Sequence, residues 1–151
     1  MDKSAIVYLS IGSNLGARSQ LINKAIELLK QYGTIESVSK KFESKPVGFE
    51  SENDFLNIMI KYRTNLEPES LLVFTQSIEK EIGRVKTTDH YEDRFIDIDI
   101  IFFDHIVMES DQLKIPHPRY RTRNFVLEPL LDLEDVQDPL TFIFASQLLR
   151  C

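Results

Sequence analysis

The stretch DRFIDIDIIFF, residues 93–103, carries two aspartates inside an otherwise apolar run. From Ile96 onward its β-branched and aromatic side chains are typical of a buried β-strand. Because side chains alternate between the two faces of a strand, Asp97 and Asp99 should lie on the same face. Two neighbouring carboxylates repel each other and lose hydration on a sheet. The pattern therefore predicts a strand whose polar face belongs to a charged site.

Paired carboxylates without histidine or cysteine among them are hard oxygen ligands, the kind that Mg²⁺ prefers. A divalent cation that bridges Asp97 and Asp99 would remove their mutual repulsion. A glycosidase also uses two carboxylates, but they flank a sugar across a gap, which neighbouring positions on one strand do not provide. The remaining alternative is a pair of edge-strand aspartates exposed to water. We favour the magnesium site.

Basic residues gather on both sides of the aspartate strand. The stretch KIPHPRYRTR, residues 114–123, follows the strand, and Arg84, Lys86, His90 and Arg94 precede it. Either cluster alone is typical of a solvated surface. Both clusters together with a cation site would suit a small polyanion and its metal ions. The combination indicates phosphoryl transfer, in which a protein positions phosphates and neutralises their charge.

The composition predicts one soluble domain over residues 1–151, because 42% of the residues are hydrophobic and 28% are charged. The net charge of −6 argues against nucleic acid or anionic lipid as a partner. No apolar run reaches roughly 18 residues, and the first residues lack the pattern of a signal peptide. The single cysteine, Cys151, excludes an internal disulfide and a cysteine-based metal cluster. We expect a cytoplasmic monomer without a membrane span.

Apolar periodicity and turn residues divide the chain into alternating strands and helices. Gly33 and Gly83 are expected to end the two main helices, and Asn65 is expected to cap the second one. Strands are expected at residues 5–11, 34–44, 54–64 and 96–103, main helices at 18–32 and 67–82, a hairpin at 104–110, and short helices at 125–133 and 142–149. The order βαββαβ predicts an α+β, ferredoxin-like fold. In that fold helices cover one face of an antiparallel sheet, the other face is free for a site, and a C-terminal extension follows.

The turn GSNLG, residues 12–16, joins the first strand to the first helix, where phosphate-binding loops are often found. It lacks the Lys-Ser/Thr pair of a P-loop and the three glycines of a dinucleotide fingerprint. We interpret it as a tight turn with a helix cap. ATP, if it binds, would bind without a Walker motif.

Five motifs occur together in this chain. They are YLSIGSNLG at Tyr8, FLN at Phe55, GRV at Gly83, R-x-x-D-I-D-I at Arg94 and IPHPRYRTRNFVLEPL at Ile115. In this order and spacing they closely resemble the 6-hydroxymethyl-7,8-dihydropterin pyrophosphokinase family of folate biosynthesis, over essentially the whole chain. The resemblance implies transfer of a diphosphate from ATP to the hydroxymethyl group of the reduced pterin, with release of AMP. ATP and 6-hydroxymethyl-7,8-dihydropterin would be the small-molecule substrates.

The resemblance also implies roles for individual residues. Asp97 and Asp99 match ligands of two Mg²⁺ ions, and Arg84 and Arg94 match catalytic arginines on and at the edge of a mobile loop. Positions that bind ATP are matched by Gln76, Glu79, Lys86, Ile100, His117 and Arg123. Positions that bind the pterin are matched by Ser44, Val47, Phe55, Asn57 and Phe125.

The residues themselves agree with the pterin assignment only in part. A flat heteroaromatic ring with several donors and acceptors suits two aromatic faces, here Phe55 and Phe125, and the amide of Asn57. Without the resemblance, however, both phenylalanines would be interpreted as core packing.

Two other functions fit parts of the sequence. A non-catalytic ferredoxin-like module would bind RNA or a regulatory ligand, but RNA recognition needs exposed aromatics in a basic setting. The pair Asp97 and Asp99 and the net charge of −6 argue against it. A metal-dependent phosphodiesterase would use the same carboxylates, with water as the nucleophile in place of a bound alcohol. The product formed from ATP distinguishes these alternatives.

Overall fold

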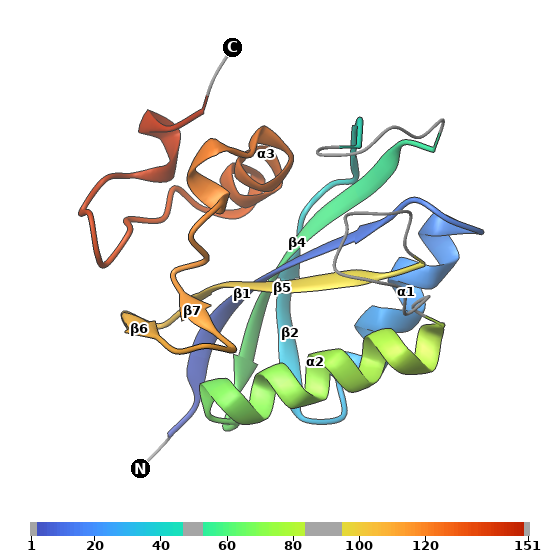
Figure 1. Cartoon of the computed structure of the whole chain (residues 1–151), viewed down its shortest axis with the longest axis horizontal. Coiled ribbons are helices and arrows are strands. Elements are labelled where there is room, and N and C mark those ends of the chain that lie inside the picture. Colours follow the sequence, from blue (N-terminus) through green and yellow to red (C-terminus); the bar gives the residue numbers. More distant parts are fainter. Residues whose placement is uncertain (1–2, 47–52, 84–94, 150–151) are drawn as a thin grey trace.

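A computed structural model describes residues 3–46, 53–83 and 95–149 (Figure 1). Its main feature is a five-stranded sheet with the strand order β2-β4-β1-β5, in which β3 also pairs with β4. All of these pairs are antiparallel. The strands are β1 (Ala5–Ser13), β2 (Gly33–Val38), β3 (Phe42–Ser44), β4 (Phe55–Thr64) and β5 (Asp97–Phe103). With α1 (Arg18–Leu29) after β1 and α2 (Pro68–Ile82) after β4, the predicted α+β, ferredoxin-like fold is confirmed.

The two faces of the sheet carry separate hydrophobic cores. Alternate residues of the central strand β1, such as Leu9 and Ile11, pack with Ile98 and Ile100 of β5 under α1 and α2. The intervening residues, such as Tyr8, belong to a second core beneath α3 (Asn124–Leu133). Figure 1 shows the sheet between α1 and α2 on one side and α3 on the other.

The sequence predicted that the second face of the sheet would be free. The structure shows instead that α3 covers part of its length. Met59, Ile101 and Phe102 are buried there against Val126 and other apolar residues of α3. This helix is itself strongly apolar, so the face that it presents to the sheet must be covered. Among the described residues, this face is open at the end beyond α3 where β5 begins.

The main helices differ from the predictions at their ends. α1 stops at Leu29, and Gly33 opens β2 instead of ending the helix. A Cβ atom at Gly33 would lie 2.3 Å from Cζ of Tyr62, so glycine is required there for close packing. The cap of α2 is Glu67, without a side-chain hydrogen bond, and not Asn65. Gly83 ends α2 as predicted, with a φ of 110° that favours glycine.

The C-terminal extension begins with a hairpin of β6 (Met108–Glu109) and β7 (Lys114–Ile115), which reaches further than the predicted residues 104–110. A 3₁₀ turn, η1 (Tyr120–Thr122), then leads into α3. The predicted helix at 142–149 is wrong, because only the short turn η2 (Ala145–Gln147) forms. Phe142 has a φ of 64°, which interrupts a helix at its first residue. No helix among the described residues is long and apolar enough to cross a membrane.

Candidate active site

The aspartates of β5 lie at the open end of the second sheet face. Asp97 and Asp99 are both half-buried, while Ile98 and Ile100 are buried on the opposite face. The predicted same-face arrangement is therefore confirmed. On the neighbouring strand β1, Asp97 is opposite Gly12 and Asp99 is opposite Ser10. The carboxylates thus have a small side chain and a glycine as their neighbours on β1.

Gly12 also determines how the next strand contributes to the site. It pairs with Asn57 of β4, and a Cβ atom at Gly12 would lie 3.1 Å from Oδ1 of Asn57 and 3.4 Å from Cδ1 of Phe55. Both side chains thus lean over the glycine. From the sequence, Gly12 was interpreted as a turn residue, and this role was missed. The available signal was its spacing: Gly12 follows Ser10 by two residues in β1, so a glycine lies on the same strand face as Ser10.

The amide of Asn57 is held in a defined orientation. Its Nδ2 donates hydrogen bonds to the carbonyl oxygen of Phe42 at 3.1 Å and to Oγ of Ser44 at 2.8 Å. Asn57 is only 3% exposed, and Ser44 on β3 pairs with Phe55 on β4. The structure therefore brings together three residues predicted for the pterin, namely Ser44, Phe55 and Asn57.

One cavity, of about 440 Å³, borders the aspartate pair. It extends from β5 to the β6–β7 hairpin and to the basic loop, residues 116–123, that precedes α3. The predicted site residues in its wall are Asp97, Asp99, Ile100, His117 and Arg123. Arg119 also lines it and was not among the predicted site residues, although it belongs to the basic cluster noted in the sequence. An acidic wall thus faces a basic wall, an arrangement suited to a polyanion that carries a metal ion.

A second cavity, of about 570 Å³, lies beside the first. Its wall includes Ser44 on β3 and Phe125 on α3, together with Arg119 and Arg123 of the basic loop. The two arginines line both cavities, so the cavities adjoin at these side chains. The guanidinium carbon of Arg123 lies 5.4 Å from the centroid of the Phe125 ring, in cation–π contact.

His117 is neutral near pH 7. Burial and the positive charge of Arg123 lower the pKa of His117 to about 4, although the negative charge of Asp97 acts in the opposite direction. Its Nδ1 accepts a hydrogen bond from the backbone N–H of Arg119 at 3.2 Å. This hydrogen bond assigns the ring hydrogen to Nε2. His117 can therefore donate a hydrogen bond to an anion without being charged.

Two residues predicted to bind ATP lie on α2. Glu79 is 3% exposed, and its Oε2 accepts a hydrogen bond from the backbone N–H of Ile98 at 2.9 Å. Its carboxylate thus attaches α2 to the β5 strand between the two aspartates. Gln76 is exposed on the same helix. Neither side chain lines the two cavities among the described residues.

Four predicted site residues, Val47, Arg84, Lys86 and Arg94, lie outside the described residues, as does the whole of the predicted mobile loop, residues 84–93.

Comparison with known protein families identifies the family of this chain. The sequence model of the family 7,8-dihydro-6-hydroxymethylpterin-pyrophosphokinase (HPPK) matches residues 8–135. The chain belongs to the HPPK family. The match includes every described residue of the aspartate pair, the basic loop and the two cavities.

Relatives of known name support the HPPK assignment. The chain is 44% identical over 130 residues to the 2-amino-4-hydroxy-6-hydroxymethyldihydropteridine pyrophosphokinase of Aquifex aeolicus, covering 86% of this chain and 81% of that protein. It is 40% identical to the Bacillus subtilis protein of the same name, covering 85% and 77%. It is also 46% identical to the folic acid synthesis protein fol1 of Pneumocystis carinii, covering 89% of this chain but 18% of that protein.

Solved structures support the fold. The wild-type HPPK-DHPS of Plasmodium falciparum matches with a TM-score of 0.74 at 17% identity, covering 98% of this chain and 44% of that one. At this low identity the likeness concerns the HPPK fold alone.

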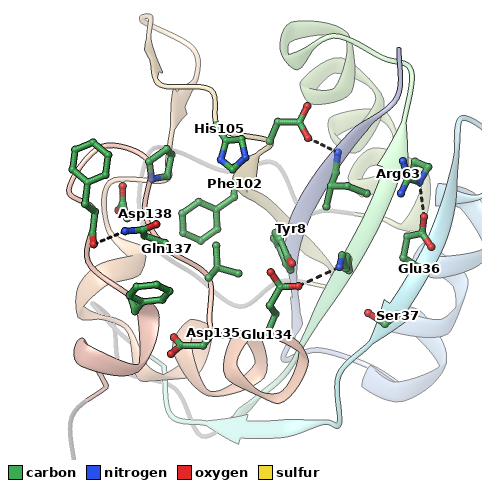
Figure 2. Close-up of a pocket in the computed structure, with 17 residues that line it drawn as sticks. Tyr8, Glu36, Ser37, Arg63, Phe102, His105, Glu134, Asp135, Gln137 and Asp138 are labelled. Carbon is green, nitrogen blue, oxygen red and sulfur yellow. Dashed lines mark hydrogen bonds and ion pairs between the residues drawn. The ribbon is translucent and has the colours of Figure 1, made fainter. Parts of the chain in front are cut away.

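A larger cavity, of about 910 Å³, lies at the other end of the same sheet face (Figure 2). No predicted site residue lines it. Two ion pairs lie in its wall: Nζ of Lys61 lies 3.2 Å from Glu134, and Nε of Arg63 lies 2.6 Å from Glu36. The HPPK site predicted from the sequence is therefore separate from this larger cavity.

The described residues fit the magnesium ions that the sequence predicts. No group of three or more His, Cys, Asp or Glu side chains that could enclose an ion occurs in the described part of the chain. Mg²⁺ is commonly held by one or two carboxylates, with water and substrate phosphates as its other ligands. Asp97 and Asp99, on one face beside the small residues Ser10 and Gly12, match that coordination.

Proposed function

We propose that this chain transfers a diphosphate from ATP to the hydroxymethyl group of 6-hydroxymethyl-7,8-dihydropterin, with ATP in the 440 Å³ cavity and the pterin in the adjoining 570 Å³ cavity. Membership of the HPPK family makes the chain a pyrophosphokinase of folate biosynthesis. The observation that supports this placement is the shared wall. Arg119 and Arg123 line a cavity that contains two carboxylates and a second one that contains Phe125.

The polyphosphate of ATP would lie between the acidic and basic walls. Asp97 and Asp99 would hold two Mg²⁺ ions, which neutralise phosphate charge when bound. Arg119 and Arg123 would contact phosphate oxygens through their guanidinium groups. His117 would donate Nε2–H to a phosphate oxygen. Because its pKa is about 4, the imidazole stays neutral near pH 7, and small pH changes there do not alter the charge of the site.

The pterin would extend from the 570 Å³ cavity toward β4. Ser44 and Phe125 line that cavity. Phe55 and Asn57 do not line it, but Asn57 is hydrogen-bonded to Ser44. Asn57 is already oriented by Phe42 and Ser44, so its Oδ1, which lies over Gly12, can accept a hydrogen bond from a pterin N–H. Phe55 and Phe125 would cover the two faces of the ring. An amide fixed before binding loses little entropy when the ligand arrives, which favours affinity.

The reaction requires the pterin hydroxyl to reach the β-phosphorus at the junction of the cavities. A bond forms between that oxygen and the β-phosphorus, and the bond from the β-phosphorus to the α,β-bridging oxygen breaks. AMP leaves with that oxygen, and the hydroxyl proton passes to solvent. The protein contributes positioning and charge neutralisation, as is general for phosphoryl transfer.

Further roles rest on the sequence motifs. We propose that Arg84, Lys86 and Arg94 act on the phosphates and that Val47 contacts the pterin through its backbone. Gln76 would lie near the ribose or adenine, and Glu79 would support that region by fixing β5 to α2. We also propose a cytoplasmic monomer with one domain over residues 1–151.

Product analysis tests this function. The protein is incubated with ATP, Mg²⁺ and the reduced pterin, and nucleotides and pterins are separated by chromatography. We expect AMP and pterin diphosphate in equal amounts, and no AMP when the pterin is left out. ADP as the product would contradict diphosphate transfer. Pterin-independent hydrolysis of ATP would favour the phosphodiesterase alternative.

A further inference from the structure

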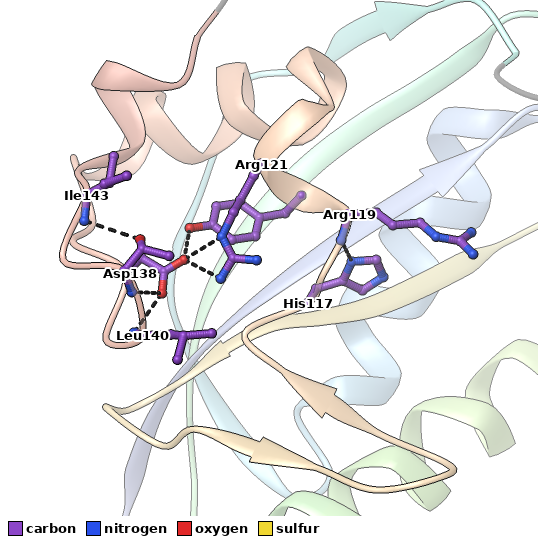
Figure 3. Close-up of polar contacts among 8 residues, drawn as sticks. His117, Arg119, Arg121, Asp138, Leu140 and Ile143 are labelled. Atoms are coloured by element: carbon purple, nitrogen blue, oxygen red, sulfur yellow. Dashed lines mark hydrogen bonds and ion pairs between the residues drawn. The ribbon is translucent and has the colours of Figure 1, made fainter.

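Asp138, in the segment after α3, has a fully buried carboxylate with an unusually complete set of partners (Figure 3). Oδ2 accepts hydrogen bonds from the hydroxyl of Tyr120 and from Nε of Arg121 at 2.9 Å, and Nη2 of Arg121 lies 2.7 Å from it. Oδ1 accepts hydrogen bonds from the backbone N–H groups of Leu140 at 2.8 Å and Thr141 at 3.2 Å.

These partners keep Asp138 ionised. Burial raises the pKa of Asp138, but hydrogen bonds from Tyr120, Leu140, Arg121 and Thr141 outweigh it, so the pKa lies below its usual value. A buried charge is stable only when it is paired and hydrogen-bonded in this way. The carboxylate therefore joins the C-terminal segment to the basic loop by charge-assisted bonds.

The two loop residues that Asp138 binds lie between the two arginines of the proposed site. Backbone hydrogen bonds from Thr122 to Arg119 and from Arg123 to Tyr120 close the η1 turn around them. The Tyr120 ring packs on Phe102, with ring centroids 5.0 Å apart. The middle of the loop is thus fixed to the C-terminal segment and to the end of β5, while Arg119 and Arg123 reach the cavities.

We infer that Asp138 is a positioning residue for ATP binding, because it holds Tyr120 and Arg121 and thereby places Arg119 and Arg123 at the junction of the two cavities. This inference rests on the proposed function, in which those arginines contact the polyphosphate. Asp138 lies beyond residues 8–135, the part matched by the HPPK family. Its role is therefore assigned by the contacts in this chain.

The direction of Arg121 supports a positioning role. Three arginines lie within five residues of the basic loop, but Arg121 points to Asp138 and away from His117 and Arg119 (Figure 3). Long side chains lose considerable rotamer freedom when they bind a ligand. A loop already fixed at its centre avoids the further cost of ordering its backbone, so the arginines on either side lose only this side-chain freedom.

The test measures binding of an α,β-methylene ATP analogue with Mg²⁺ by calorimetry, at a temperature well below the melting temperature of each variant. Asp138→Asn should weaken binding about tenfold, comparable to the loss of one hydrogen bond to a charged group. Tyr120→Phe retains the ring and its packing on Phe102, and it should weaken binding about threefold. Asp135→Asn is the control, because Asp135 lies on the same segment but accepts its hydrogen bonds from Ser146. It should bind the analogue normally.

A second set of variants separates this inference from the proposed function. Arg119→Met and Arg123→Met should each weaken binding, and normal binding by both would overturn the polyphosphate contacts themselves. In the Arg119→Met, Arg123→Met double variant, Asp138→Asn should have no further effect, because its influence passes through those arginines. If the arginine variants weaken binding but Asp138→Asn and Tyr120→Phe change only the melting temperature, Asp138 has a purely structural role and the inference is wrong.

Discussion

Gly12→Ala should damage pterin binding while ATP binding stays intact. The added Cβ would lie 3.1 Å from Oδ1 of Asn57, closer than ordinary van der Waals contact, and 3.4 Å from Cδ1 of Phe55. One of these side chains must shift by a few tenths of an ångström. The backbone of Gly12 does not need a left-handed conformation, so the substitution should leave the strand itself intact.

The size of the effect follows from the bonds that orient Asn57. A shift of its amide lengthens the hydrogen bonds to Ser44 and Phe42, now 2.8 and 3.1 Å, and moves Oδ1 away from the pterin. Weakening one or two such hydrogen bonds costs about 1–2 kcal/mol. The dissociation constant for the pterin should therefore rise by a factor of about 5 to 30. The constant for an ATP analogue should change less than about twofold, because Gly12 does not line that cavity.

Pterin binding can be measured by calorimetry or by the fluorescence of the ligand. The chain contains no tryptophan, so the pterin signal is free of tryptophan emission. The Asn57→Ala variant serves as the control background for a double variant. Adding Gly12→Ala to it should have little further effect, because the displaced amide is absent. Normal pterin binding by Gly12→Ala, or a loss of ATP affinity instead, would refute the placement of the pterin beside Asn57 of β4.

Three further outcomes are expected. Asp97→Asn and Asp99→Asn should each lower kcat at least about a hundredfold. The melting temperature should be unchanged or raised, because each substitution removes a repulsive charge from the metal site. Near-normal turnover would exclude the carboxylates from the mechanism. Phe125→Ala should weaken pterin binding by about 1–3 kcal/mol in calorimetry through lost stacking, and a selective loss of ATP binding would contradict its place in the pterin cavity. Because the pKa of His117 is about 4 in the folded protein and 6.5 without the fold, the folded state resists its protonation. Denaturant titrations should therefore show stability decreasing as the pH falls from 6.5 to 4, by up to about 3 kcal/mol, and His117→Asn should reduce that decrease. An identical pH dependence in the variant would exclude His117 as its source.

The sequence predicted most strands of the central sheet well, because their signals are local, but the single strand predicted at 34–44 is divided into β2 and β3. Apolar alternation and helical periodicity, with Gly83 at a helix end, depend on neighbouring residues alone. The position of Asp97 and Asp99 on one face followed from the same alternation. The family resemblance then brought in Ser44, Asn57 and Phe125, whose separation in the chain hides their proximity.

The errors came from tertiary contacts. Gly33 resembled a helix stop, but the Tyr62 ring on a distant strand requires a glycine there. The apolar stretch at 142–149 resembled a helix, yet the backbone hydrogen bonds around Asp138 place Phe142 at a positive φ. Arg119 and Arg121 were indistinguishable in the basic cluster. Their difference becomes visible only in the structure, where Arg121 pairs with the buried carboxylate of Asp138 and is directed away from the cavities. Asp138 lies after α3, so no local pattern links it to the basic cluster.

The most direct test of the two-cavity site is a crystal structure of the protein with the α,β-methylene ATP analogue, Mg²⁺ and 6-hydroxymethyl-7,8-dihydropterin. We predict that the triphosphate lies between Asp97 and Asp99 on one side and Arg119 and Arg123 on the other. The pterin ring should contact Phe125, with Asn57 at its edge and its hydroxyl directed toward the β-phosphorus. A pterin bound elsewhere, for example in the 910 Å³ cavity beside Tyr8, would contradict the account.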